Sequence, residues 1–216
     1  MSKLEVLIKE LCPRGVEYKK ISDCVEYNRG KGLTKNDIGT GENPIILYGE
    51  LYTKYGDYIN EINSFASNQA VLTSKLIKKG SILCPISSTT KEAQIGKASV
   101  LKISDVFLGG DAISLFPHDD INPDYLMYVL NGKTFKFEKM KCVKGTTIQH
   151  LDPNAMLQIE IPVPPLPIQE EIAKILDNFT ELTAELTAEL TAELKARKKQ
   201  YEYYRDKLLS FKRIGE

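Results

Sequence analysis

The sequence predicts an α/β (α+β) fold, in which a β-rich domain with short helices is followed by one long, coiled-coil-forming helix at the carboxyl-terminal end. Three observations predict it. Short apolar runs alternate with polar or Gly-containing turns as far as Pro117. Four prolines crowd residues 162–167, and the next segment, 168–214, contains neither Gly nor Pro. Within that segment the word TAEL occurs three times in succession, at 183–194, and its residues favour a helix.

The first element expected is a short amphipathic helix. Ser2 and Glu5 have the spacing of a capping box. The apolar residues Val6, Leu7, Ile8 and Leu11 follow, and Pro13 with Gly15 should end the helix.

A β-rich core with irregular loops is expected next. Its strands should come from five runs rich in apolar and β-branched residues, at 44–48, 70–73, 81–86, 98–103 and 112–116. Polar or Gly-containing turns separate them.

Two helices and a loop should complete this domain. Pro123 suits the first position of a helix that continues to Leu130 and stops at Asn131-Gly132. A shorter helix is expected at 134–140, and a loop containing Lys and Thr at 141–150.

The chain then divides into three parts, a domain over 1–161, a stiff Pro-rich elbow over 162–167 and a helical region over 168–216. Prolines packed this densely cannot lie inside a helix, so the elbow should be extended. The helix should run from Ile168 to about Phe211 and measure roughly 65 Å at 1.5 Å per residue.

Apolar residues form a stripe along this expected helix. They are Ile172, Ile175, Leu176, Phe179, Leu182, Leu186, Leu190 and Leu194, with Tyr204 and Leu208 in a second cluster near the tip. A helix with such a stripe needs a partner, and the chain offers no second long helix. The partner should be the same rod of another copy, or another protein.

Composition and motifs exclude several classes of function. The 216 residues carry no net charge, and the four cysteines with two histidines form no zinc-binding pattern. No P-loop, glycine fingerprint or HExxH is present. We therefore expect no catalytic residue, metal or cofactor. No signal peptide or membrane-spanning run is visible, and unpaired cysteines suit a reducing cytoplasm.

Lysines and hydroxyl side chains gather in three segments. A solvated surface would have this composition, and so would loops that bind phosphates or base edges. The candidate residues are Lys31, Thr34, Lys35, Ser87, Ser88, Thr89, Thr90, Lys91, Lys141, Lys144, Thr146, Thr147 and Gln149.

The passage from the last loop into the helix reads GTTIQHLDPNAMLQIEIPVPPLPIQEEIAKILD, over residues 145–177. Its distinctive residues are Pro162, Pro164, Pro165, Leu166, Gln169, Ile172, Leu176 and Asp177. This passage resembles the elbow and helix start of a known family, the specificity subunits of type I restriction–modification systems. YRDKLLS at 204–210 is similar to the family's helix end, and tandem TAEL words occur in the spacer helix of some members. Upstream, LGGDAISLFP and INPDYLMYVLN are similar to the family's target-recognition domains.

This resemblance implies a non-catalytic subunit that binds double-stranded DNA through the loops named above. Methyltransferase subunits would bind to it and supply the S-adenosylmethionine site, and through them restriction subunits would join. The family's usual chain has two recognition domains and two helical regions, whereas this one has one of each. The resemblance therefore implies a half-subunit that forms an antiparallel homodimer and reads an inverted-repeat target.

Two other readings fit the residues. One is a self-associating scaffold whose domain binds protein instead of DNA. The other is an enzyme with an unrecognised site, which the scarcity of histidine disfavours. Salt-dependent binding to duplex DNA distinguishes the DNA-binding subunit from the scaffold, because neutralised phosphates release counterions.

Overall fold

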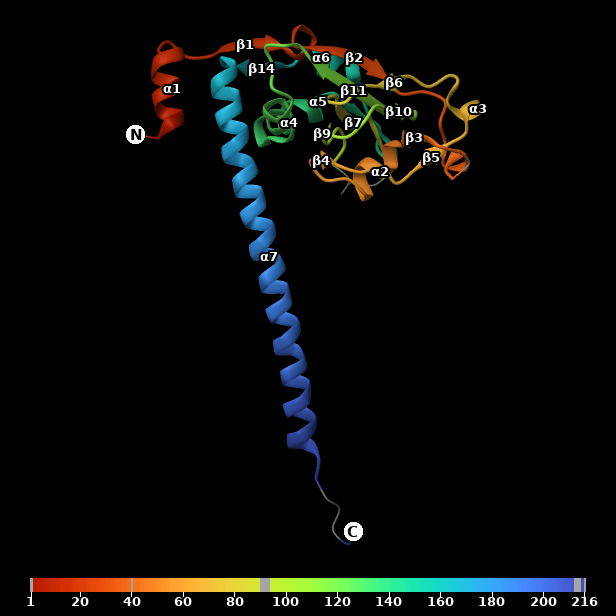
Figure 1. The fold of residues 1–216 in the computed structure, drawn as a ribbon, viewed down its shortest axis with the longest axis vertical. Helices are drawn as coiled ribbons and strands as arrows, with labels where there is room; N and C mark the ends of the chain where they lie inside the picture. The colour runs from red at the N-terminus through yellow and green to blue at the C-terminus, as the bar shows by residue number, and fades with distance from the viewer. Residues whose placement is uncertain (1, 40, 90–93, 212–214, 216) are drawn as a thin grey trace. The chain divides into compact units, whose positions relative to one another are not determined.

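The computed structural model describes residues 2–39, 41–89, 94–211 and 215. The chain separates into two compact units, Met1–Ala173 and Lys174–Glu216. The first is β-rich with short helices, and the second contains most of α7, a single helix over Leu166–Leu209 (Figure 1). The predicted fold class is confirmed.

The largest sheet has five strands in the order β2-β11-β7-β9-β4. All of its pairs are antiparallel except β4–β9, which is parallel. These strands span Val25–Arg29, Ala112–Pro117, Ile82–Pro85, Ser99–Leu101 and Tyr58–Ile59.

The described residues also form three smaller sheets. A four-stranded sheet has the order β5-β3-β10-β6, with strands Phe65–Ala66, Asn43–Ile46, Val106–Leu108 and Leu76–Ile77. A three-stranded sheet has the order β12-β13-β8, with strands Val143–Lys144, Gln149–Leu151 and Ser87–Ser88. β1 (Glu17–Lys20) pairs antiparallel with β14 (Glu160–Val163).

The helices of the globular unit begin where the sequence supplies caps. α1 (Lys3–Leu11) has the complete Ser2–Glu5 capping box. α4 (Pro123–Asn131) starts with proline, and the Asn122 side chain accepts from the next two free N–H groups, those of Asp124 and Tyr125. α5 spans Lys133–Lys141 and α6 spans Pro153–Leu157. The short helices are α2 (Tyr48–Thr53), α3 (Asn68–Val71) and the 3-10 turns η1 (Ile21–Asp23) and η2 (Lys35–Asp37).

The main core lies where β7, β9 and β11 pack with α4, α5 and α6. Ile82, Ile113, Leu115 and Leu126 are fully buried there. Burying one such side chain contributes about 1.5–3 kcal/mol.

Two expectations about secondary structure are wrong. Residues 70–73 were expected as a strand, but Ser67 caps α3 by accepting from the Ala70 N–H, and that helix ends at Val71. Residues 141–150 were expected as a loop, but they contain the hairpin β12–β13.

The elbow is shorter than the prolines suggested. Pro162 and Val163 belong to β14, and α7 begins at Leu166 with Pro167 in its first turn. Only Pro164 and Pro165 separate the strand from the helix. Proline is tolerated in a first turn because those N–H groups have no helical partner.

Gln169 fastens the start of α7 to the globular unit and is completely buried. Its Nε2 donates to the carbonyl oxygens of Asp120 (2.9 Å) and Pro164 (2.8 Å). Its Oε1 accepts from the Asn122 N–H at 2.8 Å. Nearby, the Tyr125 hydroxyl donates to the Pro162 carbonyl at 2.9 Å. The side chain thus joins the strand–helix joint to the segment before α4.

Replacing Gln169 by leucine should destabilise the globular unit. Leucine keeps the bulk but leaves the part-buried Asn122 N–H and two carbonyls without these bonds, at about 1–3 kcal/mol per group. We expect the free energy of unfolding, from urea titration, to fall by about 2 kcal/mol or more. Gln158→Leu is the control, since exposed Gln158 only accepts from Lys20 and should change stability by less than about 0.5 kcal/mol. Equal losses in the two variants would contradict this role for Gln169.

Candidate functional site

A β-hairpin brings together the last group of sequence-predicted site residues. In it Val143 pairs with Leu151 and Lys144 with His150. The turn between the strands begins at Gly145, whose φ is +96°. A Cβ there would lie 2.1 Å from the Ile148 carbonyl oxygen, so only glycine allows this close approach.

Most side chains of this hairpin are exposed. Thr146 and Thr147 lie in the turn, Lys144 just before it, and Gln149 is half-buried just after it. Lys141 is the last residue of the neighbouring helix α5. These five predicted residues therefore lie in one surface region that carries ammonium, hydroxyl and amide groups, in which strand alternation places Gln149 on the face of the hairpin opposite to Lys144 and His150.

The two lysines of this surface differ in how strongly they are held. Lys141 makes a two-oxygen ion pair with Glu138 (2.7 and 2.8 Å) and lies over the Phe137 ring at 4.8 Å. Lys144 reaches only one oxygen of Asp152, at 3.5 Å, and its side chain is 79% exposed. Lys144 is therefore the freer of the two to meet an anion from outside.

Asp152 also caps helix α6, accepting from the Asn154 and Ala155 N–H groups. The Ala155 bond is the first cause that holds the pKa of Asp152 below its usual value, and Lys144 lowers it further. The carboxylate is thus ionised at neutral pH and offsets part of the lysine charge.

Ser87 and Ser88 are not in an exposed loop, which corrects the sequence analysis. They form β8, which pairs with β13, and they are only 4% and 2% exposed. The Ser87 hydroxyl forms a hydrogen bond with Nδ1 of His150 at 2.9 Å. The backbone carbonyl of Ser87 accepts from the Tyr52 hydroxyl at 3.1 Å. These bonds fix the hairpin to the core. Of the described residues in this group, only Thr89 is exposed. Thr90 and Lys91 lie outside the described residues.

Lys31, Thr34 and Lys35 are exposed but belong to another part of the unit. The Lys31 N–H donates to Leu108 of the four-stranded sheet at 3.1 Å. Thr34 donates to the carboxylate of Asp37 through its hydroxyl and its N–H, and these bonds lower the pKa of Asp37. These contacts therefore place this group beside a different sheet from that of the hairpin.

Sequence reasoning missed one buried lysine beneath the hairpin. Lys139 is 4% exposed and donates to the Gly96 carbonyl at 2.8 Å. Burial lowers its pKa. A composition count treats it as a surface cation, but here it ties α5 to the segment before β9. The sequence did contain a signal of this burial. Lys139 lies four residues after Phe135, which is also buried, so both residues are on the same face of α5.

Helix α7 exposes most of the apolar stripe that the sequence predicted. Ile172, Ile175 and Leu176 are partly buried near the start of α7. Beyond them the side chains are 50–71% exposed, and these are Phe179, Leu182, Leu186, Leu190, Leu194, Tyr204 and Leu208. Among the described residues, nothing in the chain covers this part of the stripe.

No cluster of His, Cys, Asp or Glu in the described part of the chain could hold a metal ion. No described helix is long and apolar enough to cross a membrane.

A family model for the type I restriction modification DNA specificity domain matches residues 13–196. The chain belongs to the specificity-subunit family of type I restriction–modification systems. This membership confirms the resemblance that the elbow and the TAEL words indicated.

Curated relatives agree with this assignment. A type I restriction enzyme specificity subunit of Escherichia coli is 28% identical over 198 residues, or 91% of this chain and 48% of that protein. A putative type I restriction enzyme specificity subunit of Haemophilus influenzae is 42% identical over 167 residues, or 74% of this chain and 40% of that protein. The chain spans about half the length of the curated relatives it matches.

Solved structures show the same fold. The HsdS subunit from Thermoanaerobacter tengcongensis matches 85% of this chain and 44% of its own, with a TM-score of 0.59 and 18% identity. A chain from a study of complex assembly and conformational transition of the type I R-M system matches 92% of this chain and 48% of its own, with a TM-score of 0.66 and 18% identity.

Gly145→Ala should unfold the hairpin turn of this specificity-subunit chain. The added methyl group would clash with the Ile148 carbonyl oxygen. A positive φ in a residue other than glycine lowers stability by about 1–3 kcal/mol in addition. Gly15→Ala is the matched control, because Gly15 has φ +102° and open space around its Cβ position. Thermal unfolding should show a clearly larger loss for Gly145→Ala. Similar losses would mean that the turn relaxes without cost.

Proposed function

We propose that this chain is a non-catalytic, sequence-specific DNA-binding subunit that works as a half-subunit. Two copies associate through antiparallel α7 rods and present two identical recognition domains to a bipartite, inverted-repeat target. Methyltransferase subunits dock on the dimer and supply S-adenosylmethionine and the methylation chemistry. Restriction subunits join through them.

The exposed leucine stripe on α7 is the observation that carries this proposal. The described residues form one globular unit and one long helix. Leu182, Leu186, Leu190 and Leu194 are each more than half exposed. A row of leucines on a 44-residue helix requires an apolar partner, and a second copy supplies an identical row.

The hairpin surface supports the choice of DNA as the other ligand. Lys144 suits a phosphate or a guanine edge, and Gln149 suits an adenine edge. The hydroxyls of Thr146 and Thr147 suit phosphate oxygens. Because the whole chain carries no net charge, attraction to DNA has to come from such local groups.

Two-fold symmetry would give the target its form. Identical domains related by a two-fold axis read the same bases on opposite strands, so the target is an inverted repeat with an unspecified spacer. The rods separate the two domains and set the spacer length. One TAEL unit adds roughly 6 Å of helix, which is about one or two base pairs at 3.4 Å each.

Replacing Lys141 and Lys144 with alanine should weaken binding to duplex DNA and reduce its salt dependence. Each lost phosphate contact lowers the slope of log affinity against log salt by about one. Lys144→Ala alone should account for most of the change, because Glu138 already holds Lys141. Fluorescence anisotropy over a salt series measures both quantities.

Lys20→Ala is the control for this series, since Lys20 is exposed but belongs to β1. If the slope of log affinity against log salt is unchanged in the double variant, the DNA-binding surface lies elsewhere than the hairpin. Absence of salt-dependent DNA binding by the wild-type chain would favour the protein-binding scaffold instead.

The variant with Leu186→Asp and Leu190→Asp should be monomeric. Each buried leucine contributes about 1.5–3 kcal/mol, so the four leucines lost from a dimer weaken it by about 6 kcal/mol or more. The control places the same charges on the opposite side of α7, with Ala184→Asp and Ala188→Asp, and should remain dimeric. Light scattering at micromolar concentration distinguishes them, and a dimeric leucine variant would exclude the rod interface.

A further inference from the structure

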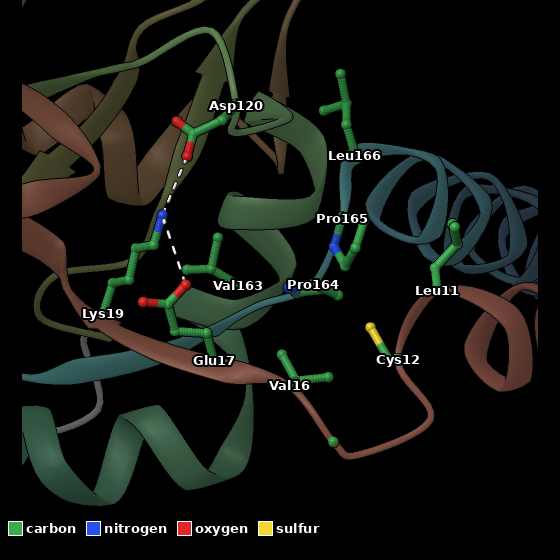
Figure 2. Close-up of a pocket in the computed structure, with 11 residues that line it drawn as sticks. Leu11, Cys12, Val16, Glu17, Lys19, Asp120, Val163, Pro164, Pro165 and Leu166 are labelled. Carbon is green, nitrogen blue, oxygen red and sulfur yellow. Dashed lines mark hydrogen bonds and ion pairs between the residues drawn. The ribbon is translucent and has the colours of Figure 1, made fainter.

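A cleft of about 330 Å³ lies within the globular unit, beside the first turn of α7. Figure 2 shows Leu11, Pro165 and Leu166 toward one end of it and Lys19 with Asp120 and Glu17 toward the other. The sulfur of Cys12 faces Pro164 and Pro165 (Figure 2). The volume is at the lower end of the range for pockets, about 300–1,000 Å³. It therefore suits a few side chains and not a whole helix.

The polar end of the cleft carries an excess of negative charge. Lys19 pairs with Asp120 at 3.3 Å and approaches Glu17 at 3.9 Å. Two carboxylates therefore face one ammonium group, and both carboxylates are more than half exposed. A partner for this cleft should be apolar with a positive charge beside it.

The end of the second unit has this composition. Tyr201, Tyr204, Leu208 and Leu209 are exposed on α7, and Phe211, just after its end, is 82% exposed. Lys207 lies among them. Among the described residues of the chain, nothing covers this apolar tip.

The repeat fixes which parts of two antiparallel rods meet. Leu182, Leu186, Leu190 and Leu194 are spaced symmetrically about Ala188. Only an axis level with Ala188 places all four leucines opposite leucines. Residues equally far from Ala188, before and after it, then lie at the same level on the two rods.

Several other positions along the rod agree with this register. Ile172 lies level with Tyr204, and Ile175 with Tyr201, so partly buried isoleucines meet exposed aromatic rings. Opposite charges also meet. The pairs are Lys174 with Glu202, Asp177 with Lys199 and Glu181 with Lys195. Glu170 with Asp206 is a like-charge pair in this register.

We infer that the rod tip Leu208–Phe211 of one copy docks in this cleft of the second copy. In the same register Phe211 reaches the level of Pro165, which lines the cleft. Leu208 and Phe211 then cover the wall formed by Leu11, Pro165 and Leu166, and Lys207 lies near the acidic end. The inference rests on the proposed antiparallel homodimer and adds a second contact at each end of it.

Cross-linking between two differently marked populations of the full chain tests the contact. All chains carry Cys12→Ser and Cys142→Ser, which leaves only the buried Cys24 and Cys84. One population carries Leu11→Cys and the other Phe211→Cys. After mixing and exchange of subunits, a short bis-maleimide should join them, giving a species of twice the chain mass in a denaturing gel. Peptide mass mapping should find the link between positions 11 and 211.

Tyr203→Cys is the matched control in place of Phe211→Cys. It is also an exposed aromatic position near the tip, but it lies about two helical turns before position 211. It should link poorly to position 11. Light scattering on the same samples reports the dimer independently.

The outcomes separate the two proposals. Dimers that link from position 211 and much less from 203 support the cleft contact. Dimers without a link from 211, or with equal links from both positions, overturn the cleft contact and leave the dimer standing. Monomers in light scattering overturn both.

Discussion

The buried amide of Gln169 is the interaction on which the joint between strand and helix depends. Prolines at 164, 165 and 167 remove three N–H donors but keep their carbonyl acceptors. The Pro164 carbonyl therefore needs a donor from elsewhere, and Gln169 Nε2 provides it. The same side chain satisfies Asp120 and Asn122. A glutamine one turn into the helix thus makes a donor-poor joint acceptable in a buried place.

The two units differ in how they treat their apolar side chains. The globular unit buries its apolar side chains in its own core, whereas α7 exposes most of its own. Within the repeats, the hydroxyls of Thr183 and Thr187 donate to carbonyls four residues earlier. Threonine is thereby satisfied inside the helix, and glutamate is solvated. Leucine is the residue of the TAEL unit that remains exposed, which supports the proposed role of the rod in dimer assembly.

Local signals in the sequence predicted the elements that depend on neighbours along the chain. The Ser2 capping box, Pro123 at a helix start and the TAEL helix are of this kind. The pairing of β8 with β13 was not predictable in this way. These strands contain two and three residues and lie some sixty residues apart, so no periodicity reports them.

The predictions for the candidate site also succeeded where they depended on nearby residues and failed where they depended on distant ones. Lys141, Lys144, Thr146, Thr147 and Gln149 were found together because they are close in sequence, and the hairpin keeps them together. Ser87 and Ser88 were misjudged because their burial is caused by a distant strand. Composition identifies polar residues but does not tell which of them face solvent.

In the proposed dimer the repeat and the end contacts constrain each other. Removing one whole TAEL unit from each rod keeps the leucines symmetric about a new midpoint. Ile172 and Tyr204 remain equally far from that midpoint, and so do Pro165 and Phe211. Removing one residue instead would rotate the tip by about 100° relative to the start of the helix. Rod length can therefore change in steps of four residues, at about 40° of rotation each, while both end contacts keep their levels. A repeat of this unit length is what a rod of adjustable length with fixed ends requires.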